Sequence, residues 1–397
     1  MQNTKSPNSF MTVLPLSKVG IDGFRCLRSL ELEGLGRINI LIGGNNSGKT
    51  SVLEALAILC RPYNPEEWIS MIRRRDFGGL DETIIQSMRW CFTQTAGLSD
   101  PDQLMEAACE LSCMGNFPLR SLRAQYAEFI GEPSQYEIPE QYKEDFHKRI
   151  ELLGKNIRGC ELIYFVDFPD FDRFPKPAGE MSLDPDIPPS IKLWEKLLLQ
   201  SRKQFRSPKI SSETLTPYSY QINARQVRAY SWQIFQENST SVLELLRDFD
   251  ADVENIDIAS FHGDRPAIYI KHKKLGVAPL SIFGNAMRRT VLLATTLLSL
   301  KGGGVLLIDE VEAGIHTGML GRVFEWLVKS AGALDVQVFV TTHSLEALDA
   351  MVAARPLLNE DDIVTFHLSQ TPERTVGKRL YGDLLRRLRF ERGLDVR

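Results

Sequence analysis

Three short runs of hydrophobic residues, near the two ends of the chain, stand out in its polarity pattern. They cover Ile38–Ile42, Val305–Ile308 and Val336–Val340, and none contains a charged residue. A continuous apolar run of this length is typical of a strand that is buried on both faces, as in a parallel sheet. Ser51–Leu59 follows the first run and has the apolar spacing of a helix. The pattern therefore predicts an α/β fold around a buried sheet.

The middle of the chain has a different pattern. Helical spacing occurs at Tyr142–Leu153, Ile191–Phe205 and Ser241–Asp248, and Ala267–His272 alternates like a strand. Six prolines fall between residues 169 and 189. A proline inside a helix costs about 3 kcal/mol, so these prolines exclude a long coiled coil. We expect a compact, mostly helical inserted lobe with a proline-rich connector.

Composition limits the class of protein. The 397 residues are 43% hydrophobic and 25% charged, as in globular proteins, and the net charge of -4 means that any nucleic-acid contact needs a local basic patch. The six cysteines are scattered without a C-x-x-C pair, which argues against a zinc site or a disulfide framework. Met1–Val13 does not read as a secretory signal, and no apolar run is long enough for a membrane span. We therefore expect a cytoplasmic protein without a membrane partner.

A glycine-rich motif lies between the first predicted strand and helix. Residues 43–50 read GGNNSGKT, which fits the phosphate-binding pattern G-x-x-x-x-G-K-[ST]. The free N–H groups and the positive dipole end of the following helix favour a polyphosphate. Lys49 is expected to reach the β- and γ-phosphates of ATP, and Thr50 to hold Mg²⁺. The predicted nucleotide-binding residues here are Gly43, Asn45, Asn46, Ser47, Gly48, Lys49, Thr50 and Ser51.

Two acidic residues end the second hydrophobic run. Asp309 and Glu310 follow Ile308, so they are expected at the carboxyl edge of a parallel sheet, where ligands of such sheets bind. Asp309 is predicted to complete the Mg²⁺ site, and Glu310 to act as the general base toward the attacking water. The third run leads to His343, for which we predict a contact with the γ-phosphate or the water, and Ser344 is placed to cap a helix.

The order of these motifs resembles the ABC-type ATPases of the SMC, RecF and OLD group. The start, Val19–Leu30, is similar to the first strand of that group, and residues 309–316 (DEVEAGIH) are similar to the region after the catalytic carboxylate in the OLD-type branch. The resemblance implies a P-loop NTPase of ABC type with an α/β core, in which Arg25 contributes to nucleotide binding. Within the group, the chain resembles OLD-type ATPases without a Toprim nuclease domain, such as the ATPase of PARIS-type anti-phage systems.

The resemblance also points to a signature loop at Pro279–Arg289. In ABC ATPases this loop completes the nucleotide site of a partner copy, so the resemblance implies a homodimer or higher oligomer in which Gly284 and Asn285 contact ATP. The OLD-type branch commonly has glycine where this chain has Ala286. The added methyl group restricts φ, so weaker loop contacts and slow turnover are expected.

Several features allow more than one interpretation. Gln86, Gln94 and Gln125 are each candidates for the Q-loop glutamine. Arg73–Arg75 and the C-terminal arginines, opposite an apolar face that includes Leu380, Leu384, Leu385 and Leu388, are either solvated or bind DNA or an acidic partner. Asp250 and Asp252 have an Asp-x-Asp spacing but follow a leucine-rich helix, so we expect no nuclease activity.

The motifs divide the chain into three parts. Residues 1–95 are expected to hold the first half of the ATPase core, 96–265 further core strands with the inserted lobe, and 266–397 the second half with a basic C-terminal helix. About 50 residues follow His343, too few for a Toprim domain. The resemblance implies a defence ATPase that responds to a phage component or DNA and controls a separately encoded effector, such as a Toprim-type nuclease. A RecF- or SMC-like DNA-repair ATPase is the alternative, ahead of a transporter subunit or a P-loop kinase.

Overall fold

The computed structural model describes ten segments of the chain. They are residues 14–62, 64–75, 84–94, 103–132, 156–168, 190–195, 209–236, 239–261, 265–354 and 362–396. The predicted helix at 142–153 and the proline-rich connector at 169–189 lie outside the described residues.

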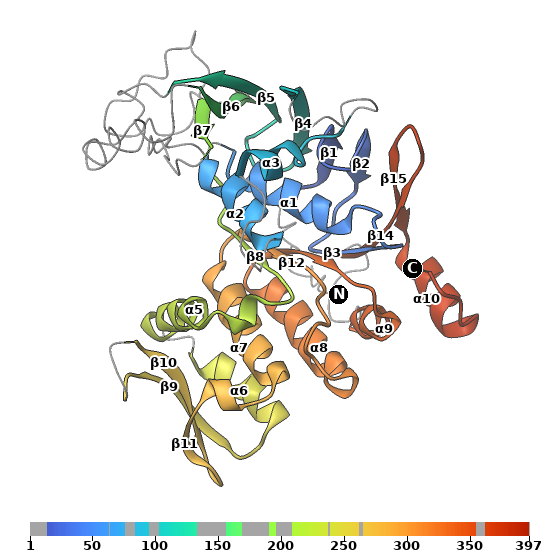
Figure 1. Ribbon diagram of the computed structural model, residues 1–397. Helices are drawn as coiled ribbons and strands as arrows, with labels where there is room; N and C mark the ends of the chain where they lie inside the picture. The colour runs from blue at the N-terminus through green and yellow to red at the C-terminus, as the bar shows by residue number, and fades with distance from the viewer. Residues whose placement is uncertain are drawn as a thin grey trace, which may run out of the picture.

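A six-stranded sheet forms the centre of the molecule (Figure 1). Five of its strands are parallel, and only the edge strand β15 runs antiparallel to its neighbour. The three hydrophobic runs form three adjacent strands of this sheet, which confirms the predicted buried sheet and the α/β class. The strand order is β15 (Thr375–Leu380), β14 (Ile363–Gln370), β3 (Ile38–Gly43), β13 (Gln337–Thr341), β12 (Val305–Ile308) and β8 (Ser212–Leu215).

Helices cover both faces of this sheet. On one face lies α1 (Lys49–Cys60), which shares a core with Leu41, Leu307 and Phe339. The alternate residues of the same strands point to the other face and pack against α8 (Thr317–Ala333) and α9 (Leu345–Ala353). Burial on both faces explains why these strands consist of unbroken apolar runs.

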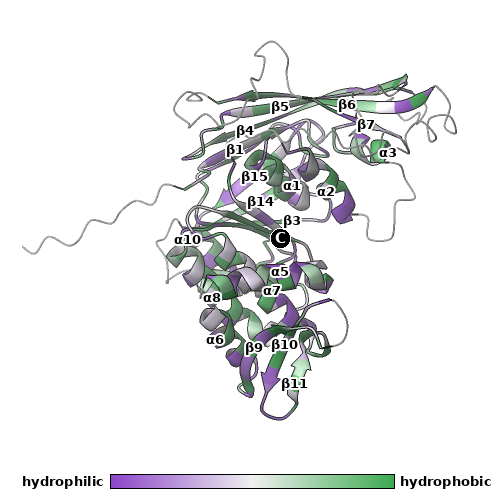
Figure 2. Ribbon diagram, turned by 90° about the vertical axis from the view of Figure 1, so that its left-hand side faces the viewer, coloured by the Kyte–Doolittle hydropathy of each residue, from purple (hydrophilic) through white to green (hydrophobic). Residues whose placement is uncertain are grey.

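A second six-stranded sheet lies over α1 and is antiparallel throughout (Figures 1 and 2). Together with α2 (Pro65–Arg75) and α3 (Ile84–Arg89), its inner face belongs to the same core as α1. The strand order is β2 (Leu30–Glu33), β1 (Lys18–Asp22), β4 (Glu106–Met114), β5 (Ser121–Gly131), β6 (Ile157–Asp167) and β7 (Ser190–Trp194).

This sheet corrects the prediction for Ile191–Phe205. Instead of starting a helix, Ile191–Trp194 lie in β7 and pair with β6, while residues 196–205 lie outside the described residues. Pairing with a strand some 30 residues away overrides a local pattern that fits either structure. In the described part of residues 96–265, strands outnumber helices, because most of these strands belong to the two large sheets.

A separate small lobe packs around α7 (Asn285–Ser299) at the bottom of Figure 1. It contains α5 (Asn223–Phe235), α6 (Ser239–Phe249) and a three-stranded antiparallel sheet of β9 (Val253–Ala259), β10 (Ala267–His272) and β11 (Gly276–Pro279). The predicted helix at Ser241–Asp248 and the predicted strand at Ala267–His272 are confirmed.

The chain ends in α10 (Gly382–Arg386) and the π-helical segment η7 (Arg387–Glu391). The predicted common apolar face is wrong, because Leu380 belongs to β15 and Leu384 is exposed, whereas Leu385 is buried. Among the described helices, none combines the length and the hydrophobicity that crossing a bilayer requires.

Candidate nucleotide-binding site

The glycine-rich motif forms a tight turn between β3 and α1. Gly43 and Gly48 have φ values of 145° and 94°, and Asn46 has a φ of 59°. Glycine adopts the left-handed region without strain, and a Cβ atom at Gly43 would collide with the carbonyl oxygen of Leu368. Within the turn, the buried Ser47 hydroxyl has no hydrogen-bond partner among the described residues, an unusual state for a buried polar group.

Lys49 begins α1 with its side chain folded over the turn. Its Nζ donates hydrogen bonds to the carbonyl oxygens of Gly43 and Gly44, at 2.8 and 2.9 Å. The residue is buried, and desolvation lowers the pKa of Lys49, while the carboxylates of Asp309, Glu310 and Glu312 oppose that shift. The ammonium group lies at the N-terminus of α1, so its charge and the positive end of the helix dipole both raise the electrostatic potential there.

Asp309 joins the two ends of the chain at the edge of the central sheet. The Thr50 hydroxyl lies 3.0 and 3.2 Å from its two carboxylate oxygens, although the residues are 259 positions apart. The Thr341 hydroxyl donates to Asp309 Oδ1 at 2.7 Å. A Mg²⁺ ion fits the Thr50–Asp309 pair, because a hydroxyl and a carboxylate leave positions for water and phosphate oxygens.

Glu310 has an unusual backbone for its residue type. Its φ is 47°, in the left-handed region that non-glycine residues rarely adopt. Its N–H donates to Thr341 Oγ1 at 2.9 Å, and its carbonyl accepts from Arg289 Nη2 at 2.7 Å. Desolvation raises the pKa of Glu310, and the nearby negative charges of Asp309 and Glu312 raise it further. A raised pKa is what a carboxylate needs to act as a base near neutral pH.

His343 lies just after β13, exposed and on the wall of the cavity described below. Its backbone N–H donates to Glu312 Oε1 at 2.9 Å. Ser344 caps α9, as predicted, through a 3.0 Å hydrogen bond from the N–H of Ala347 to its hydroxyl. The loop is therefore fixed from both sides, and it holds the imidazole beside the P-loop.

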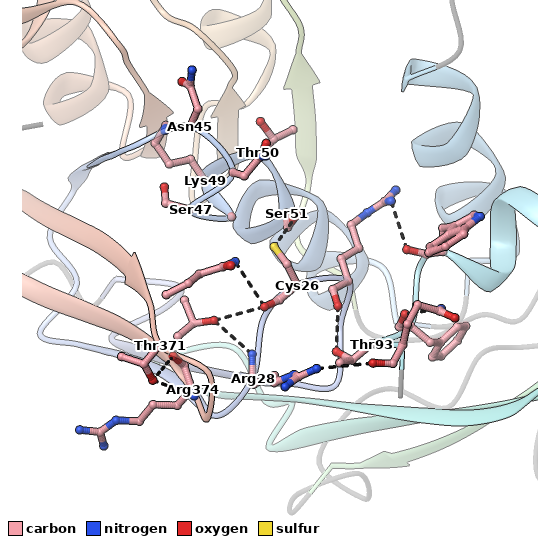
Figure 3. A pocket seen from close by; sticks show the side chains of 18 of the residues that line it. Cys26, Arg28, Asn45, Ser47, Lys49, Thr50, Ser51, Thr93, Thr371 and Arg374 are labelled. Carbon is pink, nitrogen blue, oxygen red and sulfur yellow. Dashed lines mark hydrogen bonds between the residues drawn. The ribbon is translucent and has the colours of Figure 1, made fainter. Parts of the chain in front are cut away.

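A cavity of about 1070 Å³ opens beside the P-loop (Figure 3). In Figure 3, the side chains of Asn45 and Lys49 lie on one side of it, and those of Thr371 and Arg374 lie on the other. Arg25 lies on its wall, with Nε 2.6 Å from Glu54 Oε2. Of the predicted binding residues, the cavity is lined by Arg25, Asn45, Asn46, Ser47, Gly48, Lys49, Thr50, Ser51 and His343.

Other predicted residues lie off this cavity. The wall of the cavity does not include Gly43, Asp309 or Glu310. Asp309 nevertheless contacts Thr50, and Thr50 does line the cavity. Gly284 and Asn285 are exposed at the N-terminus of α7 and do not line the cavity. Ala286 lies in the first turn of α7 and is not among the residues with positive φ, so its methyl group imposes no backbone strain.

Of the three candidate glutamines, one lines the cavity. Gln94 lines it, with its amide nitrogen donating to the carbonyls of Arg89 and Phe92. Gln86 belongs to α3 and Gln125 to β5, and neither lines the cavity. Gln94 is therefore the stronger candidate for a Q-loop role.

Sequence reasoning missed part of the cavity wall. Arg28, Arg75 and Arg374 contribute positive charge to it, and the β14–β15 turn supplies Thr371 and Pro372. Arg28 Nη1 donates to the carbonyl of Pro372 at 3.1 Å, which links the first strand pair to this turn. The sequence marks Arg75 only as part of the basic cluster Arg73–Arg75, and no local motif places these residues at the cavity, because their proximity depends on contacts between distant parts of the chain.

The other charged clusters have internal partners. Glu67 pairs with Arg74, and Glu54 pairs with Arg75, Nε to Oε1, at 2.7 Å. Arg389 forms a bidentate pair with Asp349 at 2.8 and 2.7 Å. The exposed arginines of the C-terminal segment are Arg386, Arg387 and Arg392.

Asp250 and Asp252 contact the end of β10 and the turn that follows it. His272 Nδ1 accepts the backbone N–H groups of Lys274 and Leu275, so its Nε2 carries the proton that is donated to Asp250 at 3.0 Å. Asp252 pairs with Lys274. Both imidazole nitrogens thus have hydrogen-bond partners, which accounts for the grouping of these side chains without a metal.

Two families of ATPase domains match the chain. The family described as "AAA domain, putative AbiEii toxin, Type IV TA system" matches residues 130–349, and the one described as "AAA ATPase domain" matches residues 15–151. The second match contains the P-loop, and the first contains Asp309, Glu310 and His343. The parallel core and these matches agree with the predicted P-loop fold of ABC type.

Individual proteins show similarities of different extent. An ATP/GTP phosphatase of Helicobacter pylori is 22% identical over 395 residues, which cover 93% of this chain and 96% of that protein. The DNA replication and repair protein RecF of Actinobacillus pleuropneumoniae is 50% identical over 46 residues, 12% of this chain and 13% of that protein. A solved structure, an Smc head bound to the C-winged helix domain of ScpA, has a TM-score of 0.47 and 11% identity, with 92% and 98% of the two chains covered.

Proposed function

This chain belongs to the AAA-domain family described as "AAA domain, putative AbiEii toxin, Type IV TA system", and we propose that it binds MgATP at residues 43–50 and hydrolyses it. The observation that carries the proposal is the contact between Thr50 of the P-loop and Asp309 at the end of β12. Two motifs from opposite ends of the chain meet there, with Glu310 adjacent. The name of the H. pylori relative, an ATP/GTP phosphatase, supports the same reaction class.

Each residue has a distinct role in this proposal. Lys49 and the first N–H groups of α1 bind the β- and γ-phosphates. Thr50 and Asp309 hold Mg²⁺, which when bound neutralises charge that develops on the phosphates. Glu310 takes a proton from the attacking water, and His343 donates a hydrogen bond on the γ-phosphate side.

Steady-state phosphate release tests the activity. Lys49→Ala should abolish ATP binding, because it removes the cation that contacts the phosphates. Glu310→Gln should keep binding and reduce turnover by about two orders of magnitude or more, because only the base is lost. Hydrolysis by Glu310→Gln at the wild-type rate would exclude Glu310 as the base.

We further infer that the active site is completed by a second copy of the chain. Gly284 and Asn285 are exposed and lie off the cavity of their own chain, where they are available to another molecule. A head-to-tail dimer would give each cavity the α7 N-terminus of its partner. Light scattering of Glu310→Gln with ATP should show a dimer, while Lys49→Ala stays monomeric; a monomer in both cases would contradict the composite site.

For the biological role, we propose an OLD-type, PARIS-like defence ATPase that senses a phage component and controls a separate effector, such as a Toprim-type nuclease. The reference to a toxin–antitoxin system in the family description supports a role in such a two-component system. Phage plating on cells with and without the locus is the direct test. Equal plating across a broad panel of phages would count against defence.

A RecF-like role in DNA binding or repair is the second candidate. It is favoured by the local similarity to RecF and by the exposed arginines Arg386, Arg387 and Arg392. Binding of duplex DNA that weakens with added salt and with substitution of these arginines would support it. Absence of DNA binding at low salt would exclude the RecF-like role.

A further inference from the structure

Arg289 is a buried arginine on α7 whose contacts reach the catalytic edge of the sheet. It is only 5% exposed. Its Nη2 lies 2.7 Å from the carbonyl oxygen of Glu310 and 3.2 Å from that of Asp309, and its Nη1 lies 3.0 Å from the carbonyl oxygen of Thr216. One guanidinium group thus ties together the ends of two adjacent strands, β8 and β12.

The contacts of Arg289 go to backbone oxygens, although carboxylates are close. Asp309, Glu310 and Glu312 contribute an attractive field at the guanidinium, whereas burial lowers the pKa of Arg289 to about 10. The planar fork of an arginine can hold several carbonyls in a fixed geometry, which an ammonium group cannot do equally well. The arrangement is therefore suited to fixing a backbone rather than to neutralising a carboxylate.

The backbone that Arg289 holds is the strained one. Glu310 has a φ of 47°, a conformation that persists only when surrounding contacts enforce it. Thr341 supports the turn from the other side, because its hydroxyl accepts the Glu310 N–H and donates to Asp309. The turn is thus held between α7 and β13.

The segment that follows the turn passes close to the start of α7. Gly314 has a φ of 75°, and a Cβ atom there would lie 3.6 Å from Cβ of Asn285 and 3.9 Å from Cδ of Arg289. Arg289 follows Asn285 by four residues, about one helical turn. A displacement of the α7 N-terminus would therefore be passed to the carbonyls of Asp309 and Glu310.

We propose that Arg289 is a positioning residue that keeps the Asp309–Glu310 turn in its catalytic shape and links the start of α7 to hydrolysis within the same chain. The inference rests on the proposed ATPase function. It makes Glu310 responsive to whatever occupies the exposed Gly284–Asn285 end of α7. Arg289 does not line the nucleotide cavity, so we expect it to affect turnover and not binding.

The test compares Arg289→Gln with a matched control, Arg225→Gln. Arg225 is a partly buried arginine on α5 whose side chain donates to the carbonyl of Thr214 and pairs with Glu213, both in β8, and it has no hydrogen bond to the turn among the described residues. We expect Arg289→Gln to lower kcat at least about tenfold per folded molecule, with a Kd for a fluorescent ATP analogue within about twofold of wild type. Arg225→Gln should keep kcat.

Equal kcat values in the two variants, or a loss of analogue binding in Arg289→Gln that matches its loss of turnover, would overturn the proposal. Failure of the proposed function is a different result, because then the wild-type chain itself would not hydrolyse ATP. Thermal unfolding of both variants supplies the folded fraction used for normalisation.

A mixing experiment separates action on the same chain from action on the partner. In the mixed dimers formed by Arg289→Gln and Glu310→Gln chains, the intact Glu310 belongs to the Arg289→Gln chain and faces a partner with normal α7. If Arg289 acts within its own chain, the mixture gains no activity over Arg289→Gln alone. Recovery toward half of the wild-type rate per mixed dimer, about one quarter for an equal mixture that pairs at random, would show that the residue acts through the partner, and would overturn the proposal.

Discussion

At the scale of single residues, the arrangement around Asp309 explains how the site is built. Its carboxylate accepts hydrogen bonds from Thr50 on α1 and from Thr341 at the end of β13. The chain's own hydrogen bonds therefore fix the orientation of the Asp309 carboxylate. Preorganised groups of this kind lose little free energy to reorganisation during a reaction.

Thr341→Val tests this orientation. The side chain is almost fully buried, and valine keeps its shape while removing the bonds to Asp309 and to the Glu310 N–H. We expect turnover to fall about tenfold and the Mg²⁺ concentration at half-maximal rate to rise. Thr295→Val is the control, since that hydroxyl bonds only to carbonyls within α7. An unchanged Mg²⁺ requirement and rate in Thr341→Val would contradict the role of the residue.

The raised pKa of Glu310 predicts the pH dependence of turnover. A general base works only when deprotonated, so kcat should begin to fall at a higher pH than an ordinary glutamate, with a pKa of about 4.3, would cause. The folded state binds this proton more readily than the unfolded state, so protonation of Glu310 does not itself destabilise the fold. Measurement of kcat across acidic pH, with folding followed by circular dichroism, checks this. A kcat that stays flat down to the ordinary pKa would contradict it.

The residues that the sequence predicts are those that belong to local motifs. Lys49 and Thr50 are identified by spacing within eight residues, and Asp309 by its place after a hydrophobic run. Arg289 lies at the end of the predicted signature loop, but the contacts that give Arg289 and Thr341 their roles join them to a turn 20 to 32 positions away, and no local pattern predicts those contacts. The same holds for the cavity wall formed by Thr371 and Arg374.

At the scale of secondary structure, burial decides which predictions succeed. The core strands are buried on both faces and therefore unambiguous in sequence. The segment Ile191–Trp194 is compatible with a helix or a strand, and only its pairing with β6 decides between them. Trp194 packs edge-on against Phe129 of β5, at 4.9 Å between ring centroids.

Trp194→Ala tests whether β7 is a structural part of the antiparallel sheet. Because Trp194 is only 4% exposed, its loss should lower the free energy of unfolding by about 3 kcal/mol. Trp232→Ala, at a residue that is 52% exposed, should change it by well under half of that. Urea unfolding of both variants gives the comparison, and equal effects would show that β7 does not pack as described.

At the scale of the whole molecule, the structure separates a nucleotide cavity from an exposed signature-loop region. This separation is why a second copy is needed in the proposed mechanism. The described residues contain no evident second catalytic centre. The side chains of Asp250 and His272 are hydrogen-bonded to each other, and Asp252 pairs with Lys274.

We therefore expect the purified chain to leave DNA intact. Plasmid incubated with the protein, ATP and Mg²⁺ or Mn²⁺ should show no cleavage, because two-metal hydrolysis requires clustered carboxylates that are free to hold both ions. Cleavage that disappears in Asp250→Ala would make the protein its own effector and would remove the need for a separate nuclease.

The central claim is that ATP is hydrolysed at the site formed by the P-loop and Glu310. The most direct measurement is the identity of the nucleotide that stays bound after incubation with ATP and Mg²⁺, separated from free nucleotide and resolved by chromatography. We predict ADP on the wild-type protein, intact ATP on Glu310→Gln, and neither on Lys49→Ala. ADP on the Glu310→Gln protein, formed as fast as on the wild type, would contradict the account.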